Sequence, residues 1–106
     1  MSDPETPTQP TAEEEEPIPL PPASFAFLVM SLRAQTEMQL GLFHFGEEKE
    51  KPKPDLHLAR HSIDLLGMLQ EKTRGNLSLD EQRLLDNTLT ELRFRYLHAL
   101  EESRKP

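Results

Sequence analysis

The sequence predicts an all-α fold: a small three-helix domain that follows a disordered, acidic, proline-rich tail. Three segments repeat apolar residues at the spacing of an amphipathic helix, and no stretch alternates strictly enough to demand a β-strand. Seven of the ten prolines fall within residues 1–22, and only three follow. With 106 residues, the chain is long enough for one domain, which we place at residues 23–103.

The tail, residues 1–22, holds almost all of the net charge. It contains six acidic residues and no Lys or Arg, which accounts for all but one of the seven net negative charges. Such a segment cannot bury enough apolar surface to offset the entropy lost on ordering, so we expect it to be disordered. Its stretch Pro19-Leu20-Pro21-Pro22 also resembles polyproline ligands that bind grooves, which leaves a binding motif as the alternative to a linker.

The first helix is predicted over residues 25–40, with Ser24 as its N-cap and Gly41 as the left-handed residue after its end. One side of this helix carries the apolar residues Phe25, Leu28, Val29, Leu32 and Leu40. A second apolar set lies nearly opposite and comprises Phe27, Met30, Ala34 and Met38. A helix that is apolar on two sides packs between two layers or is shared between subunits.

A charged loop over residues 41–55 leads to the second predicted helix, residues 56–74, which Asp55 caps. Its buried stripe is predicted to contain Leu58, Ala59, Ser62, Ile63, Leu65, Leu66 and Leu69. The opposite face includes Gly67, which costs about 1 kcal/mol relative to Ala in a helix and therefore suggests the close approach of another backbone. Met68, beside it, supports a contact there.

The third helix is predicted over residues 79–102 and begins with a capping box formed by Ser78 and Glu81. The short turn before it makes the second and third helices an antiparallel hairpin. The residues around this turn, Lys72, Thr73, Gly75 and Asn76, fit a structural role better than a binding site. Lys72 is a cation near the negative helix end, Gly75 permits a left-handed conformation, and the Asn76 amide can bond the turn backbone. The third helix buries one stripe: Leu84, Leu85, Thr88, Leu89, Leu92, Tyr96, Ala99 and Leu100.

Apolar residues outside these stripes predict contacts with a protein partner or a second copy. A body of some 80 residues buries only about 60% of its extended surface and is marginal alone. The predicted contact residues are Phe27, Met30, Met38, Gly67, Met68, Phe94 and Leu97. We therefore expect a self-associating helical interaction module or adaptor.

Composition excludes several other classes. Without cysteine there is no disulfide scaffold, cysteine-ligated metal or thiol nucleophile. Without a cluster of Lys and Arg, nucleic acid is not expected as a partner. The longest apolar stretch, residues 24–32, is far shorter than the roughly 20 residues of a membrane span. We expect a soluble, cytoplasmic protein.

Catalytic and metal-binding patterns are weak. His57 and His61 are spaced to share a helix face with Asp64 one turn on, but the segment lacks the glutamate of the two-histidine hydrolase helix, and Arg60 would oppose a cation. A metal site at these residues is a minor alternative to solvated polar side chains. His44, between Phe43 and Phe45, is either a pH-sensitive contact or part of an aromatic loop. We expect no enzyme activity, no cofactor and no small-molecule ligand.

Several segments of the body together form a recognisable pattern: Ser24–Val29, Gln39-Leu40-Gly41, the unbroken register of Ile63–Leu77, and Glu81, Leu84, Leu85, Leu89, Leu92, Arg93 and Tyr96. In these residues the chain resembles the bacterial family of unknown function DUF1844. It implies a small cytoplasmic bacterial helical protein and transfers no catalytic residue. Through a similar myxobacterial polarity protein, it also implies an alternative function: an adaptor in a nucleotide-exchange complex for a Ras-like small GTPase.

Overall fold

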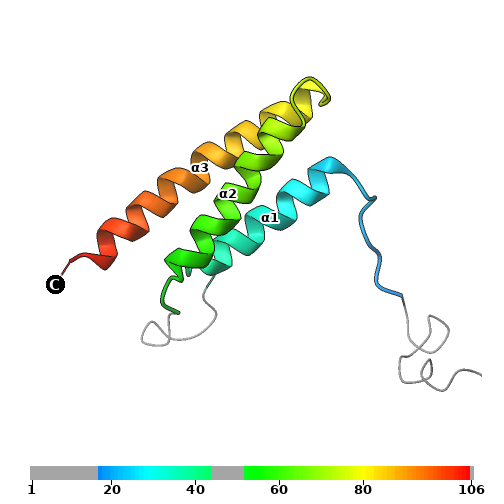
Figure 1. Cartoon of the computed structure of the whole chain (residues 1–106). Helices are drawn as coiled ribbons and strands as arrows, with labels where there is room; N and C mark the ends of the chain where they lie inside the picture. Colours follow the sequence, from blue (N-terminus) through cyan, green and yellow to red (C-terminus); the bar gives the residue numbers. More distant parts are fainter. Residues whose placement is uncertain (1–16, 44–51, 106) are drawn as a thin grey trace, which may run out of the picture.

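The computed structural model describes residues 17–43 and 52–105 (Figure 1). These residues form three helices and no strand: α1 (Phe25–Gln39), α2 (Leu56–Lys72) and α3 (Leu79–Ser103). The predicted all-α class is confirmed. The first 16 residues of the predicted disordered tail, and residues 44–51 of the loop with His44, lie outside the described residues.

Each helix begins where a short polar side chain replaces the missing backbone acceptor of its first turn. The Ser24 hydroxyl accepts a hydrogen bond from the Phe27 N–H at 3.0 Å, and the Asp55 carboxylate accepts one from the Leu58 N–H at 3.1 Å. At α3 the Ser78 hydroxyl accepts from the Glu81 N–H at 3.1 Å, while the Glu81 carboxylate accepts from the Ser78 N–H at 2.9 Å. The helix starts are thus set locally by the sequence.

The C-terminal ends differ slightly from the predicted ones. The helix α2 ends at Lys72, two residues earlier than predicted, because Thr73 takes the C-cap position and its hydroxyl donates to the Leu69 carbonyl at 2.7 Å. The helix α1 ends one residue earlier than predicted and α3 one residue later.

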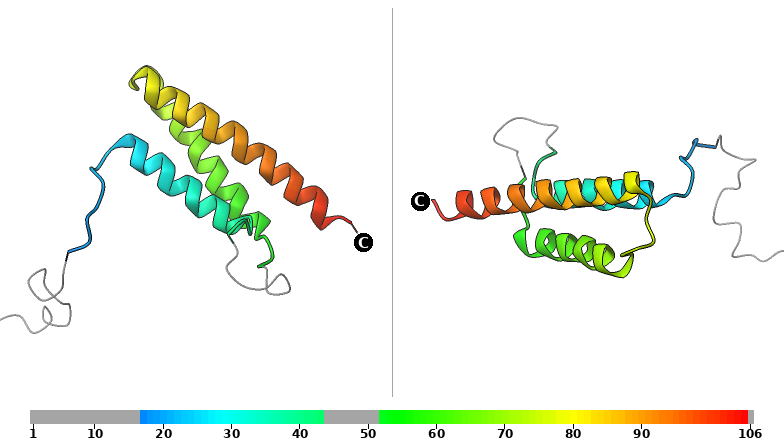
Figure 2. Two further views of the ribbon diagram at one scale, coloured as in Figure 1. Left: turned by 180° about the vertical axis from the view of Figure 1, so that it is seen from behind. Right: turned by 90° about the horizontal axis from the view of Figure 1, so that it is seen from above.

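The helices form two layers. In Figure 2 the helices α1 and α3 lie side by side in one layer and run in the same direction, and α2 forms the second layer. Since α2 runs opposite to α3 and contacts both other helices, its inner side covers one face of the α1–α3 layer. The other face of that layer remains without a covering helix among the described residues.

The core lies where the three helices meet. Its buried apolar residues are Val29, Leu40, Ala59, Ile63, Leu66, Leu85, Leu89 and Leu92. All eight residues of the stripe predicted for α3 are buried or half-buried. Full burial of such side chains contributes about 1.5–3 kcal/mol each, so this cluster is the main source of stability.

Leu58, predicted to belong to the buried stripe of α2, is exposed, and so is Leu28, which the periodicity places on the same side of α1 as Val29. Each directly precedes a fully buried residue and therefore projects about 100° away from it, at the edge of the buried stripe. Each also lies in the first turns of its helix, away from the centre of the bundle. The edge of the stripe is covered only where a neighbouring helix lies against it.

Three buried polar side chains accompany the core. The Ser62 hydroxyl of α2 donates to Gln39 Oε1 at 2.7 Å and accepts from Gln35 Nε2 at 3.3 Å, which links α2 to the C-terminal half of α1. Thr36 donates to the Leu32 carbonyl at 2.7 Å. The buried hydroxyl of Thr88 has no hydrogen-bond partner among the described residues.

Candidate functional site

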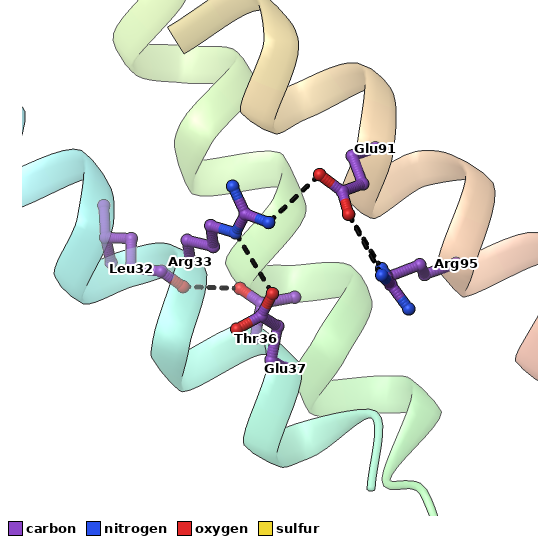
Figure 3. A network of polar contacts seen from close by, with 6 residues as sticks. All are labelled: Leu32, Arg33, Thr36, Glu37, Glu91 and Arg95. Carbon is purple, nitrogen blue, oxygen red and sulfur yellow. Dashed lines mark hydrogen bonds and ion pairs between the residues drawn. The ribbon is translucent and has the colours of Figure 1, made fainter. Parts of the chain in front are cut away.

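A chain of ion pairs joins α1 to α3 on the face away from α2. Figure 3 shows Arg33 between two carboxylates: its Nε lies 3.1 Å from Glu37 and its terminal nitrogen 3.0 Å from Glu91. Glu91 also accepts from Arg95, with a closest distance of 3.0 Å. The hydrogen bond that Arg33 donates to Glu37 and the negative charge of Glu91 raise the pKa of Arg33 further above its already high value, against the opposing effect of burial. The network links the two helices on this face.

This network lies at the border between two apolar faces of α1. Arg33 and Glu37 are the only charged residues of α1, and both are engaged in it. We call Val29, Leu32, Thr36 and Leu40 the inner face of α1, and Phe27, Met30, Ala34 and Met38 its outer face. All four residues of the outer face are exposed, as the opposite placement of the two apolar sets predicts. None of these four side chains carries a charge, so their own burial desolvates no charged group.

The C-terminal turns of α3 run past the end of α1 (Figure 2). The side chains around this place line a groove. Its volume is about 730 Å³. Its apolar lining comes from the end of α1, from the segment before α2 and from α3: Leu40, Leu42, Pro52, Pro54, Phe94 and Ala99. Lys53, Arg95, His98 and Glu102 add charged or polar side chains. We refer to this feature as the groove.

Gly41 shapes one wall of the groove. It has a φ of 75°, and an added Cβ would lie 2.9 Å from the Pro52 carbonyl oxygen. The left-handed conformation ends α1 and lets residues 52–54 approach this turn closely, as the Asp55 N–H donating to the Gln39 carbonyl at 2.7 Å also shows. The predicted role of Gly41 at the helix end is confirmed, but its contribution to a groove has no signal in the sequence.

The other predicted contact residues lie at separate places. Phe94 is largely exposed and lines the groove, whereas Leu97 is exposed on α3 outside the groove lining. Met68 is exposed on α2. Beside it, a Cβ on Gly67 would lie 3.4 Å from the guanidinium of Arg93 on α3, so the neighbour at this glycine is a side chain of the same chain. The structure therefore does not gather the seven residues into one surface.

The metal candidates are not gathered either. His57, His61 and Asp64 are exposed on α2, and Asp64 faces Arg60 at 4.0 Å. Within residues 17–43 and 52–105, no three His, Cys, Asp or Glu side chains are arranged to hold a metal ion.

The turn between α2 and α3 follows the prediction at Gly75 and departs from it at two neighbours. Gly75 is left-handed, with a φ of 83°. Thr73 caps α2 earlier than predicted, and the bond at Asn76 comes from its backbone N–H, which donates to the Thr73 carbonyl at 2.8 Å. Ser78 and Glu81 complete the capping box. Lys72 lies in the last turn of α2, where its positive charge suits the helix dipole.

No helix in the described part of the chain has both the length and the apolar composition needed to cross a bilayer. No curated protein and no solved structure matches the chain. A family model, the domain of unknown function DUF1844, matches residues 22–98, which span α1, α2 and most of α3. The chain therefore belongs to the DUF1844 family.

Proposed function

We propose that this protein is a non-catalytic interaction module that binds a protein surface, in the first place a second copy of itself, through the outer face of α1. The observation that carries the proposal is the uncharged, exposed row of Phe27, Met30, Ala34 and Met38 on a helix whose two charges are engaged elsewhere. Contiguous exposed apolar surface of this kind marks interaction sites. The absence of cysteine fits a reducing compartment such as the cytoplasm.

The spacing of these residues suits a helix–helix contact. Phe27, Met30, Ala34 and Met38 follow one another at intervals of three, four and four residues, which places them along one side of the helix. Ala34, in the middle of the row, allows a second helix to approach closely, while the flexible methionines fill the space around it. No contact among the described residues specifically favours the alternative roles in nucleotide exchange or metal binding.

The proposal is tested by sedimentation velocity on the full chain over a range of concentrations. The test variant Phe27→Ser/Met38→Ser removes two side chains that are 45% and 64% exposed. The control Leu58→Ser/Leu79→Ser removes two side chains of nearly the same exposure, 47% and 64%, outside this face. We expect the wild type and the control to associate and the test variant to remain monomeric.

A photo-crosslinking residue at position 38, compared with one at position 79, extends the test to other proteins in a native lysate. Selective crosslinking to one protein from position 38 would indicate a heteromeric partner on this face. A wild-type chain that stays monomeric and crosslinks no protein from position 38 would refute the proposal.

A further inference from the structure

We infer that the groove binds residues 17–22 of a second copy of this chain, which we call the arm. The inference deepens the proposed function, on which it rests, by naming the segment that the partner copy contributes. The arm reads Pro17-Ile18-Pro19-Leu20-Pro21-Pro22 and carries no charge. The groove offers an apolar lining of matching character.

The arm is exposed in the single chain. Ile18 and Leu20 are 78% and 81% exposed, and residues 17–24 lie outside any helix. Figure 1 shows this segment extending away from the helices, at the end of α1 far from the C-terminus. Alternating prolines restrict the backbone of the arm, so less entropy is lost when it binds. Proline-rich segments bind grooves lined by aromatic side chains, and Phe94 provides such a side chain here.

The arm is too short to place Leu20 in the groove of its own chain. From Phe25 to Leu40, where the groove begins, the helix rises about 22 Å. The five residues from Leu20 to Phe25 span at most about 17 Å when fully extended. A Leu20 side chain in the groove therefore belongs to another molecule.

The proposed pairing through the outer face of α1 brings the arm to the right place. Two copies of one helix face related by a two-fold axis perpendicular to the helix run antiparallel. The start of each α1 then lies beside the end of the partner's α1, where the partner's groove begins. A dimer of this kind contains two identical contacts between arm and groove.

The described part of the groove lining carries two basic residues, Lys53 and Arg95, and one acidic residue, Glu102, and Arg95 is also paired with Glu91. The arm carries no charge, so the contact that we infer is made by its apolar side chains.

The experiment uses two variants of the full chain with exposed side chains replaced. The arm variant is Ile18→Ser/Leu20→Ser, and the groove variant is Phe94→Ser, a change at a largely exposed residue that leaves the core intact. Leu79→Ser serves as the control because Leu79 is exposed on α3 outside the groove lining. We expect each test variant to raise the dimer Kd at least about tenfold, as loss of buried aliphatic contacts does, and the control to leave it unchanged.

Mixing the two defective variants provides the decisive measurement. A homodimer of either variant keeps the pairing of the outer faces but has no intact contact between arm and groove, whereas the mixed dimer pairs the wild-type arm of the groove variant with the wild-type groove of the arm variant. Sedimentation of the equimolar mixture should therefore show more dimer than either variant alone at the same total concentration.

Each remaining outcome separates this inference from the proposed function. A dimer that the arm variant leaves intact and Phe27→Ser/Met38→Ser abolishes would overturn the inference and support the proposed function. If the arm variant and the groove variant both lose the dimer and mixing them does not restore it, the inferred contact between the arm of one copy and the groove of the other would be overturned. A monomeric wild type would overturn the inference, and crosslinking from position 38 to a different protein would then still support the proposed function.

Discussion

The inner and outer faces of α1 both carry apolar side chains, but only the inner face contributes to the core. Val29, Thr36 and Leu40 on the inner face are buried against α2 and α3. Phe27, Met30 and Met38 on the outer face are exposed. By contrast, the exposed side of α2 carries His57, Arg60, His61, Asp64 and Glu71, as expected of a helix with one buried face. The fold thus accounts for one apolar face of α1, and the other requires an explanation outside the single chain.

The largest effect should separate the two faces directly. Leu40→Ala removes a buried side chain from the inner face and should lower the free energy of unfolding by about 2–5 kcal/mol. Met38→Ala on the outer face should change it by less than about 0.5 kcal/mol. Urea unfolding followed by circular dichroism, at concentrations where the chain is monomeric, measures both. Similar losses in the two variants would mean that the outer face also contributes to folding.

The end of α1 allows a sharper comparison between two left-handed glycines. Gly75→Ala places a Cβ in open space and should cost about 1–2 kcal/mol from backbone strain alone. Gly41→Ala adds a contact of 2.9 Å with the Pro52 carbonyl oxygen and should cost more, because the wall of the groove must move. Thermal unfolding of both variants gives the difference. Equal losses of stability in the two variants would show that residues 52–54 move away from the added Cβ at no cost in free energy.

Two buried threonines, Thr36 on the inner face of α1 and Thr88 on α3, test how much a hydrogen bond stabilises a hydroxyl in the core. The Thr36 hydroxyl has a hydrogen-bond partner, whereas the equally buried Thr88 hydroxyl on α3 has none. Thr88→Val should raise the free energy of unfolding by about 1 kcal/mol, since it removes an unsatisfied polar group while keeping the shape. Thr36→Val should give a smaller gain or a loss. Destabilisation by Thr88→Val would indicate that its hydroxyl is hydrated in solution.

Local features of the sequence were sufficient to predict the helices. Ser24, Asp55 and Ser78 each cap a helix through a hydrogen bond to a residue three positions along the chain, so their roles can be predicted without knowing the tertiary structure. Periodicity also located the buried stripes, but it does not show where a neighbouring helix ends, which is why Leu58 was assigned to the buried stripe incorrectly.

Features that join distant segments could not be predicted. Arg33 and Glu91 are 58 residues apart, and nothing in either segment indicates their pairing. The groove combines residues 40–42 and 52–54 with the C-terminal half of α3, which meet only after the helices pack. The exposed residues on α1 were predictable because amphipathic periodicity is itself local.

The smallest expected effect concerns the ion pairs at the border between the two faces. A double-mutant cycle with Arg33→Gln and Glu91→Gln should give a coupling of about 0.5–1 kcal/mol, because both side chains are partly exposed and surface pairs contribute little. The pKa of Arg33 is raised in the folded chain, so its contribution is complete below the pKa of the unfolded chain and is lost only at strongly alkaline pH. The titration of Arg33 therefore adds no pH dependence near neutrality, whereas about 1 M salt should reduce the coupling. A coupling well above 1 kcal/mol that resists salt would show that the network holds α1 against α3 as strongly as a core contact, and the inner face would then extend to Arg33.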